Sequence, residues 1–172
     1  MSVPSPAADG DMESVESFIA RAEAWLPDHL PLADTTRMEN GFGSDEEELA
    51  NVARMRATQR TLYDAGFAGI CFPAEYGGLG LTLAHQKAFD EVSAPYDMPT
   101  LINIPTFVPC GAVLLEFGTE EQKRRHIPAM LRGEELWMQF LSEPSGGSDV
   151  AGAMTTAVRD GDEWVVNGSK VW

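Results

Sequence analysis

The chain has 172 residues, of which 44% are hydrophobic and 23% charged, and these proportions are ordinary for a folded globular protein. Its length allows one compact domain with a core and part of a second domain. The formal net charge is −15, and residues 1–50 hold 12 of the acidic and two of the basic residues, so nucleic acid is a poor partner. No apolar run approaches a membrane span and the first residues do not resemble a signal peptide, so we expect a cytoplasmic protein without a membrane span.

The first helix is predicted from apolar periodicity. Residues 1–10 contain two prolines and no periodic pattern, which indicates a loose N-terminal tail. Apolar residues then recur at helical spacing from Met12 to Leu26, and Pro27 is expected to end this helix. Residues 27–43 are rich in proline and glycine and predict a connecting loop.

The second helix has the clearest start and end signals. Ser44 followed by Glu47 is a capping-box pattern at a helix N-terminus. Gly66 follows the helical pattern and can take the left-handed conformation that closes a helix. A further helix is expected from Thr82 to Val92.

The chain then changes from helices to strands. Residues 107–117 predict a fourth helix, and Thr119 with Gln122 repeats the capping pattern for a fifth that closes near Gly133. We therefore assign residues 11–134 to an α-helical N-terminal domain. After Glu134 the residues become typical of strands.

Residues 135–172 are expected to form the beginning of a β domain. Strands are predicted near 137–141, 154–158 and 163–172, and Asn167-Gly168 is a strong hairpin-turn signal. Three or four short strands complete neither a barrel nor a sandwich. We therefore expect a truncated β domain and a natural polypeptide that continues beyond Trp172.

The polar segment LSEPSGGSDVAG, residues 141–152, is the main candidate for a binding site. Ser142 supplies a hydroxyl at the expected end of a strand, and Gly146-Gly147-Ser148 allows backbone N–H groups to approach a ligand closely. From the residues alone, this segment is either a polar turn between strands or part of a ligand site.

Four motifs in order resemble those of the acyl-CoA dehydrogenase family: PAEYGGLGL, FGTEEQKRRHIPAMLRGE, WMQFLSEPSGGSDVAG and GDEWVVNGSKVW. The resemblance covers residues 73–172. It implies a mainly α fold in which an N-terminal helical bundle is followed by the first strands of an incomplete β-barrel domain. The family's C-terminal helical domain would be absent from this chain.

The resemblance also implies the chemistry. Members of the family bind FAD and remove an α-proton and a β-hydride from an acyl-CoA thioester in fatty acid and lipid metabolism. An electron-transfer flavoprotein usually reoxidises the flavin, and a homodimer or homotetramer is implied for the full-length protein. We expect the catalytic base to lie beyond Trp172, so this chain alone should be inactive.

Family roles map onto individual positions of the polar segment and of the chain end. Residues 139–141 match the stretch whose backbone contacts the flavin, and Ser142 matches a hydroxyl bonded to the isoalloxazine. Ser148 matches a serine shared by the cofactor and the pantetheine arm of the substrate, and Trp172 matches an aromatic residue stacked on the flavin. The implied cofactor-binding residues are thus Gln139, Phe140, Leu141, Ser142, Ser148 and Trp172.

Other readings remain open from the sequence. A flavin-dependent oxidase or monooxygenase shares this architecture, and a non-catalytic helical binding module is a third possibility. We find no metal-ligand spacing, and we interpret His126, in the basic run KRRH, as an exposed residue. Glu75 and Glu143 are interpreted as structural residues.

Overall fold

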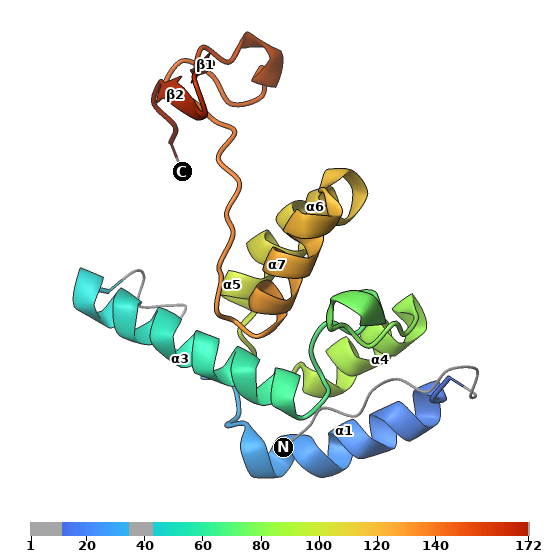
Figure 1. Ribbon diagram of the computed structural model, residues 1–172. Helices are drawn as coiled ribbons and strands as arrows, with labels where there is room; N and C mark the ends of the chain where they lie inside the picture. Colours follow the sequence, from blue (N-terminus) through green and yellow to red (C-terminus); the bar gives the residue numbers. More distant parts are fainter. Residues whose placement is uncertain (1–11, 35–42, 172) are drawn as a thin grey trace. The chain divides into compact units, whose positions relative to one another are not determined.

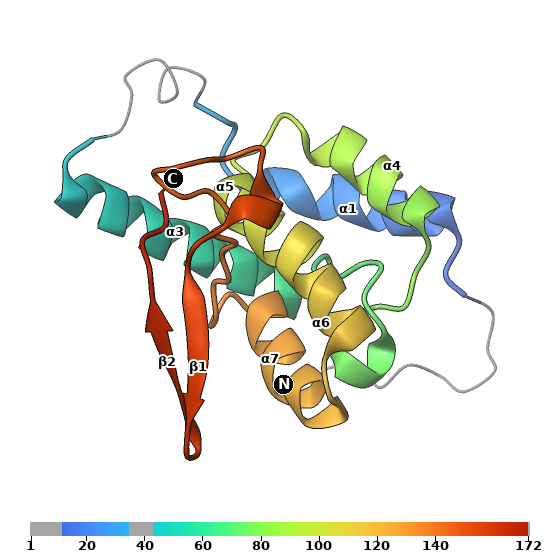
Figure 2. The same cartoon turned by 90° about the horizontal axis from the view of Figure 1, so that it is seen from above.

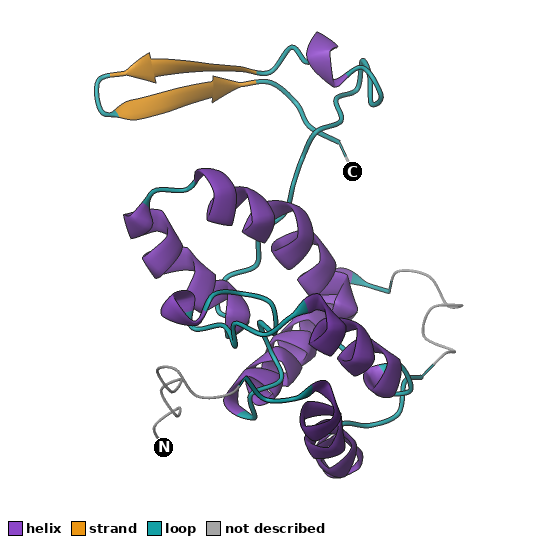
Figure 3. Cartoon of the chain, turned by 90° about the vertical axis from the view of Figure 1, so that its right-hand side faces the viewer, coloured by secondary structure: helices purple, strands orange, loops and turns teal. Residues whose placement is uncertain are grey.

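The computed structural model describes residues 12–34 and 43–171, and it divides into two compact units, Met1–Trp137 and Met138–Trp172. The first unit is helical and the second contains a two-stranded hairpin (Figures 1 and 3). The fold class predicted from the sequence, a helical bundle followed by the first strands of a β domain, is confirmed. The tail expected at residues 1–10 and Trp172 lie outside the described residues.

The first two helices begin where the sequence predicts caps. Helix α1 spans Val15–His29, and Ser17 N donates to the side chain of the N-cap residue Ser14. Helix α3 spans Asp45–Asp64 and opens with the complete Ser44 capping box. The predicted end of α1 before Pro27 is wrong, because a proline in the last turn removes one hydrogen bond without preventing Leu30 N from bonding to Leu26 O.

The first core cluster joins α1 and α4, which spans Leu83–Ser93 and lies beside α1 (Figure 2). Phe18 of α1 is fully buried, and its ring meets that of Phe67 edge-on at 5.7 Å between centroids. Phe67 in turn stacks on Phe89 of α4 at 5.6 Å. The helices are thus held together by contiguous aromatic packing.

A continuous helical run follows, made of α5 (Thr100–Pro105), the π-helical segment η2 (Thr106–Gly111) and α6 (Ala112–Phe117). Pro109 lacks the N–H that an α-helix needs, and the chain widens into π geometry around it. By length and apolar composition this run could cross a membrane, contrary to the sequence expectation. Only 22% of the run is buried, and a single run of this kind is weak evidence for a span.

Helix α7 (Glu120–Leu131) starts at the predicted Thr119 capping box and carries the second core cluster. Its buried side chains Ile127 and Met130 pack with Tyr76 of the short helix η1 (Ala74–Tyr76) and with Leu114 of α6. His126 is half-buried and its Nδ1 lies 2.8 Å from Glu135 Oε2, so its interpretation as an exposed residue is wrong.

The second unit contains strands β1 (Thr156–Asp160) and β2 (Glu163–Asn167), which pair antiparallel with Val158 opposite Val165. The hairpin turn is Gly161-Asp162, with Gly161 at φ 61°, and the predicted turn at 167–168 is wrong because Asn167 is the last residue of β2 and no strand pairs after it in the described residues. The predicted strand at 137–141 is also wrong. No strand of the described residues pairs with that segment, and without a ladder partner it stays irregular.

Candidate functional site

Ser142 lies where the two ends of the second unit meet. Its main-chain oxygen accepts a hydrogen bond from Val171 N at 3.0 Å. The preceding carbonyl, Leu141 O, accepts one from Lys170 Nζ at 3.1 Å. The segment around Ser142 is therefore fixed on one side by residues 170–171, which are close to it in space and distant in sequence.

Glu143 is the buried acid of this site. Its residue is 7% exposed, and its Oε2 accepts from Met154 N at 2.7 Å. Its Oε1 accepts from Thr155 N at 2.9 Å and from Lys170 Nζ at 2.9 Å. A carboxylate with three donors is well compensated for the loss of water.

These donors favour the ionised form of the carboxyl. The Lys170 ammonium, followed by the backbone N–H groups of Met154 and Thr155, lowers the pKa of Glu143 from 4.5 to about 2. Hydrogen bonds and a nearby positive charge that favour the charged form outweigh its burial. Glu143 is therefore an anion at neutral pH and is poorly suited to accept a proton, which agrees with its structural interpretation.

The turn after Ser142 is tight and glycine-rich. Glu143 and Gly146 exchange two main-chain hydrogen bonds at 2.9 and 3.0 Å. A Cβ at Gly147 would lie 3.5 Å from Ser142 Oγ, so the glycine leaves the space beside that hydroxyl open. Asp149 then caps the short helix η3 (Val150–Gly152) by accepting from Gly152 N.

The predicted cofactor residues are distributed unevenly over this unit. Gln139, Phe140 and Leu141 are exposed, and Ser142 is half-buried. Ser148 is exposed in the turn, and Trp172 lies outside the described residues. The structure thus brings Ser142 and Gly147 together, while the exposed segment 139–141 leads into them.

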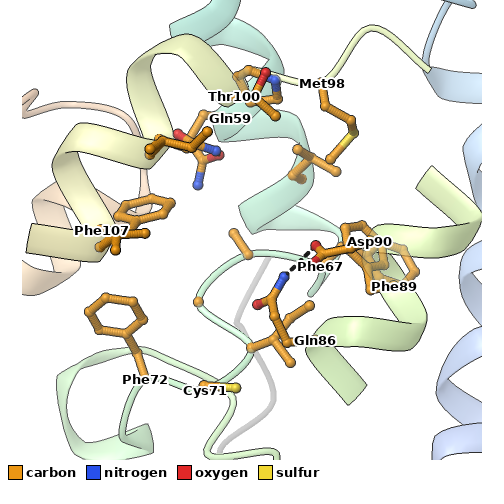
Figure 4. A pocket seen from close by; sticks show the side chains of 18 of the residues that line it. Gln59, Phe67, Cys71, Phe72, Gln86, Phe89, Asp90, Met98, Thr100 and Phe107 are labelled. Atoms are coloured by element: carbon orange, nitrogen blue, oxygen red, sulfur yellow. Dashed lines mark hydrogen bonds between the residues drawn. The ribbon is translucent and has the colours of Figure 1, made fainter. Parts of the chain in front are cut away.

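The helical unit contains a separate cavity of about 400 Å³. It lies between α4, α5 and the segment 67–72, and Figure 4 shows its aromatic walls. Phe72 and Phe107 meet edge-on there, with centroids 5.7 Å apart. Apolar lining residues include Leu62, Phe67, Ile70, Phe72, Phe89 and Phe107.

Two polar pairs interrupt the apolar wall of this cavity. Gln86 Nε2 donates to Asp90 Oδ1 at 2.8 Å on α4 (Figure 4). Asn103 Nδ2 donates to Gln59 Oε1 at 2.7 Å on the opposite side. A mainly apolar cavity with a few polar groups is typical of a small-molecule site.

The polar turn has the features that a flat, hydrogen-bonding cofactor would need. The side chain of Ser142 makes no hydrogen bond within residues 12–34 and 43–171, and the main chain of residues 139–140 is likewise unpaired there. An open hydroxyl next to a glycine, with an exposed backbone edge leading into it, fits the polar edge of a flavin ring.

Sequence reasoning missed the residues that shape this site. Lys170, Met154 and Thr155 were not singled out, although each donates to Glu143. A useful signal was present, since Lys170 is the single basic residue in the two motifs that contain Glu143 and Lys170.

A helical bundle that leads into a polar turn and a β-hairpin defines a chain with an α-helical unit followed by a small β unit. The family model for the acyl-CoA dehydrogenase N-terminal domain matches residues 15–134. The chain belongs to the acyl-CoA dehydrogenase family.

Curated relatives agree with this assignment. Acyl-CoA dehydrogenase IpdE1 of Mycobacterium tuberculosis is 41% identical over 161 residues, which are 94% of this chain and 41% of that protein. The probable acyl-CoA dehydrogenase YngJ of Bacillus subtilis is 40% identical over 117 residues, 67% of this chain and 30% of that protein. The chain therefore spans less than half the length of these relatives.

Solved structures share the fold. The Tcur3481-Tcur3483 steroid ACAD matches with a TM-score of 0.67 and 33% identity, covering 94% of this chain and 41% of that chain. The ChsE4-ChsE5 complex from Mycobacterium tuberculosis also matches with a TM-score of 0.67, at 26% identity, covering 96% and 40%.

Proposed function

We propose that this chain is part of a flavin-dependent acyl-CoA dehydrogenase that binds FAD and introduces an α,β double bond into an acyl-CoA thioester. The observation that carries the proposal is the open Ser142 hydroxyl beside Gly147, within a segment that matches the family's flavin signature. Family membership supplies the class of reaction.

The proposed cofactor contacts follow from the arrangement of the second unit. The main chain of Gln139, Phe140 and Leu141 offers N–H and C=O groups along an exposed edge. The Ser142 hydroxyl can donate to a ring atom, and a donor there stabilises negative charge that develops on the ring. When bound, the flavin supplies the hydride acceptor.

Two further residues complete the proposed cofactor site. Ser148 is exposed in the turn and can bond to the cofactor and to the pantetheine arm of the substrate. Trp172 follows Val171 in the sequence, and the N–H of Val171 bonds to Ser142 O. We assign Trp172 the role of a ring-covering aromatic residue.

We assign the acyl group of the substrate to the cavity between α4, α5 and residues 67–72. Its volume of about 400 Å³ suits a small organic group, and its walls are mainly apolar. The amides of Asn103 and Gln59 supply polar contacts at one wall. Transfer of an apolar acyl tail from water to such walls lowers its free energy.

The proposal extends to domains and partners. Residues 11–134 would be the N-terminal helical domain and 135–172 the start of the β-barrel domain of a cytoplasmic homodimer or homotetramer. An electron-transfer flavoprotein is the proposed electron acceptor. A chain of the Acidaminococcus fermentans electron transferring flavoprotein structure matches at 28% identity, with a TM-score of 0.67, covering 96% of this chain and 41% of that chain.

Flavin binding is tested with the chain itself. Amide NMR spectra are recorded while riboflavin, FAD or ADP is added, since riboflavin contains the ring and ADP does not. We expect riboflavin and FAD to shift the amide signals of residues 139–142 and 147–148, with weak affinity, and ADP to leave residues 139–142 unchanged. An absence of shifts with riboflavin, or shifts confined to the helical unit, would contradict the proposal.

A further inference from the structure

The ion pair between the buried Glu143 and the partly exposed Lys170 connects three separate stretches of chain. Lys170 Nζ is 2.9 Å from Glu143 Oε1 and 3.1 Å from Leu141 O. The same carboxylate accepts from the N–H groups of Met154 and Thr155. The Glu143 side chain therefore joins residues 141–143 to residues 154–155 and to Lys170.

This pair differs from an ordinary surface ion pair in its burial. The Glu143 side chain is 5% exposed and that of Lys170 is 27% exposed. Exposed pairs contribute little because water and salt screen them, whereas removing Lys170 would leave the buried Glu143 carboxylate without its counter-charge. By contrast, the pair Arg60–Asp64 on α3 has side chains that are 51% and 55% exposed.

The geometry encloses the polar turn. The bonds from Met154 N and Thr155 N to the Glu143 carboxylate close the loop that carries Gly147 and Ser148. The ammonium of Lys170 holds the carbonyl on the other side of Ser142. Ser142 thus lies between Leu141 O and the Glu143 carboxylate, and Lys170 Nζ bonds to both groups.

The ion pair also sets the approach of the chain's end. Once Lys170 is held at Leu141 O, the next residue, Val171, is in register to donate its N–H to Ser142 O at 3.0 Å. Without the contact of Lys170 to Leu141 O, the bond from Val171 N to Ser142 O alone would hold the segment before Glu143 against residues 170–171. A site assembled from loops needs such supporting contacts to keep its groups in place.

We propose that Glu143 and Lys170 are positioning residues for the flavin site, where they hold the Ser142 hydroxyl and Val171 in the cofactor-binding arrangement before the cofactor arrives. This proposal rests on the function proposed above. Neither residue touches the flavin in this account. They act through Leu141, Ser142 and Val171, and they lower the entropy lost when the cofactor binds.

Amide hydrogen exchange tests the positioning role without any cofactor. Four variants are compared with the wild-type chain: Lys170→Met, Lys170→Arg, Glu143→Gln and the control Lys87→Met, whose lysine is exposed on α4. We expect Lys170→Met and Glu143→Gln to speed exchange at Met154, Thr155 and Val171 at least about tenfold, because their local opening becomes easier. Lys170→Arg keeps the charge and should retain most of the protection.

The pattern of exchange separates positioning from general folding. The amides paired between β1 and β2 should keep their wild-type rates in Lys170→Met, and Lys87→Met should leave all these amides unchanged. Faster exchange throughout β1 and β2 would make the ion pair a general folding contact and overturn the proposal. Unchanged rates at Met154, Thr155 and Val171 would also overturn it.

Riboflavin binding completes the test. Its affinity, followed by amide NMR, should fall at least about fivefold in Lys170→Met and recover in Lys170→Arg, because preorganisation is lost and then restored. A wild-type chain that does not respond to riboflavin contradicts the proposed function and with it this role. A responsive wild type whose affinity is unchanged in Lys170→Met contradicts the positioning role alone.

Discussion

Gln59 on α3 donates a hydrogen bond from its Nε2 to the main-chain oxygen of Leu131, the last residue of α7, at 2.7 Å. Its Oε1 accepts from Asn103 Nδ2 on α5 at 2.7 Å. One buried amide, 1% exposed, therefore joins three helices and supports a wall of the cavity assigned to the acyl group.

Replacing this amide should destabilise the helical unit. Gln59→Leu leaves Leu131 O and Asn103 Nδ2 without their partner, and such buried unpaired groups cost about 1–3 kcal/mol. Urea unfolding followed by circular dichroism measures the loss. The control Ala57→Leu, at an exposed position of the same helix, should change stability by less than about 0.5 kcal/mol. Equal stability of the two variants would contradict the role of Gln59.

A second prediction concerns Gly78 in the turn that follows η1. A Cβ there would lie 2.2 Å from Phe72 O, which is main chain and cannot move aside freely. Gly78→Ala should therefore destabilise the chain by about 1–3 kcal/mol or more, as overpacking does. Gly146→Ala is the control, because no atom lies within 4 Å of its Cβ position. Thermal unfolding measures the stability of both variants. Equal stability would refute this explanation of why position 78 is a glycine.

The third prediction is a pH dependence of the second unit. Because the pKa of Glu143 is lowered from 4.5 to about 2, the carboxylate stabilises this unit fully above pH 4.5. That contribution is lost as the pH falls through about 2. The amide shift of Met154, which donates to the carboxylate, should titrate with that low midpoint. In Glu143→Gln the low-pH step should disappear, and a midpoint near 4.5 in the wild type would show that the ion pair is not formed.

The fourth prediction concerns the exposed hairpin. Trp164 and Val166 share one face of the hairpin and are each 64% exposed, and the edges of a two-stranded sheet can pair with another chain. The chain should therefore self-associate at high concentration in sedimentation experiments. Val166→Lys should reduce the association by placing a charge on that face.

A shortened chain provides the control for that association. Removing residues 139–172 keeps the helical unit, including the bonds between Thr106 Oγ1 and the main chain of Trp137. This shortened chain should be folded and monomeric. Equal association of the full and shortened chains would mean that the hairpin is not the contact.

The helices could be predicted because their signals are local. The capping boxes at Ser44 and Thr119 need only residues three apart, and both form. Pro27 was misjudged because a proline breaks a helix interior but is tolerated where few bonds remain to be lost. The hairpin turn was misplaced because Gly161 and Gly168 follow similar polar residues, and only strand pairing distinguishes them.

The candidate site could be predicted only in part. Ser142 and Ser148 were indicated by the motif, whereas the support for Ser142 comes from Lys170, which is 27 residues from Glu143. Such pairing depends on how the hairpin folds back, and no local pattern encodes it. The same holds for Gln59, whose bond to Leu131 spans 72 residues.

The central claim, that Ser142 binds the flavin, is tested most directly by comparing riboflavin affinities of wild type, Ser142→Ala and Ser145→Ala by amide NMR. Ser145 lies exposed in the same turn and serves as the control. Loss of one hydrogen bond, about 0.5–1.5 kcal/mol, predicts an affinity about twofold to tenfold weaker for Ser142→Ala. The affinity of Ser145→Ala should match that of the wild type. Unchanged affinity in Ser142→Ala, or an equal loss in both variants, would contradict the account.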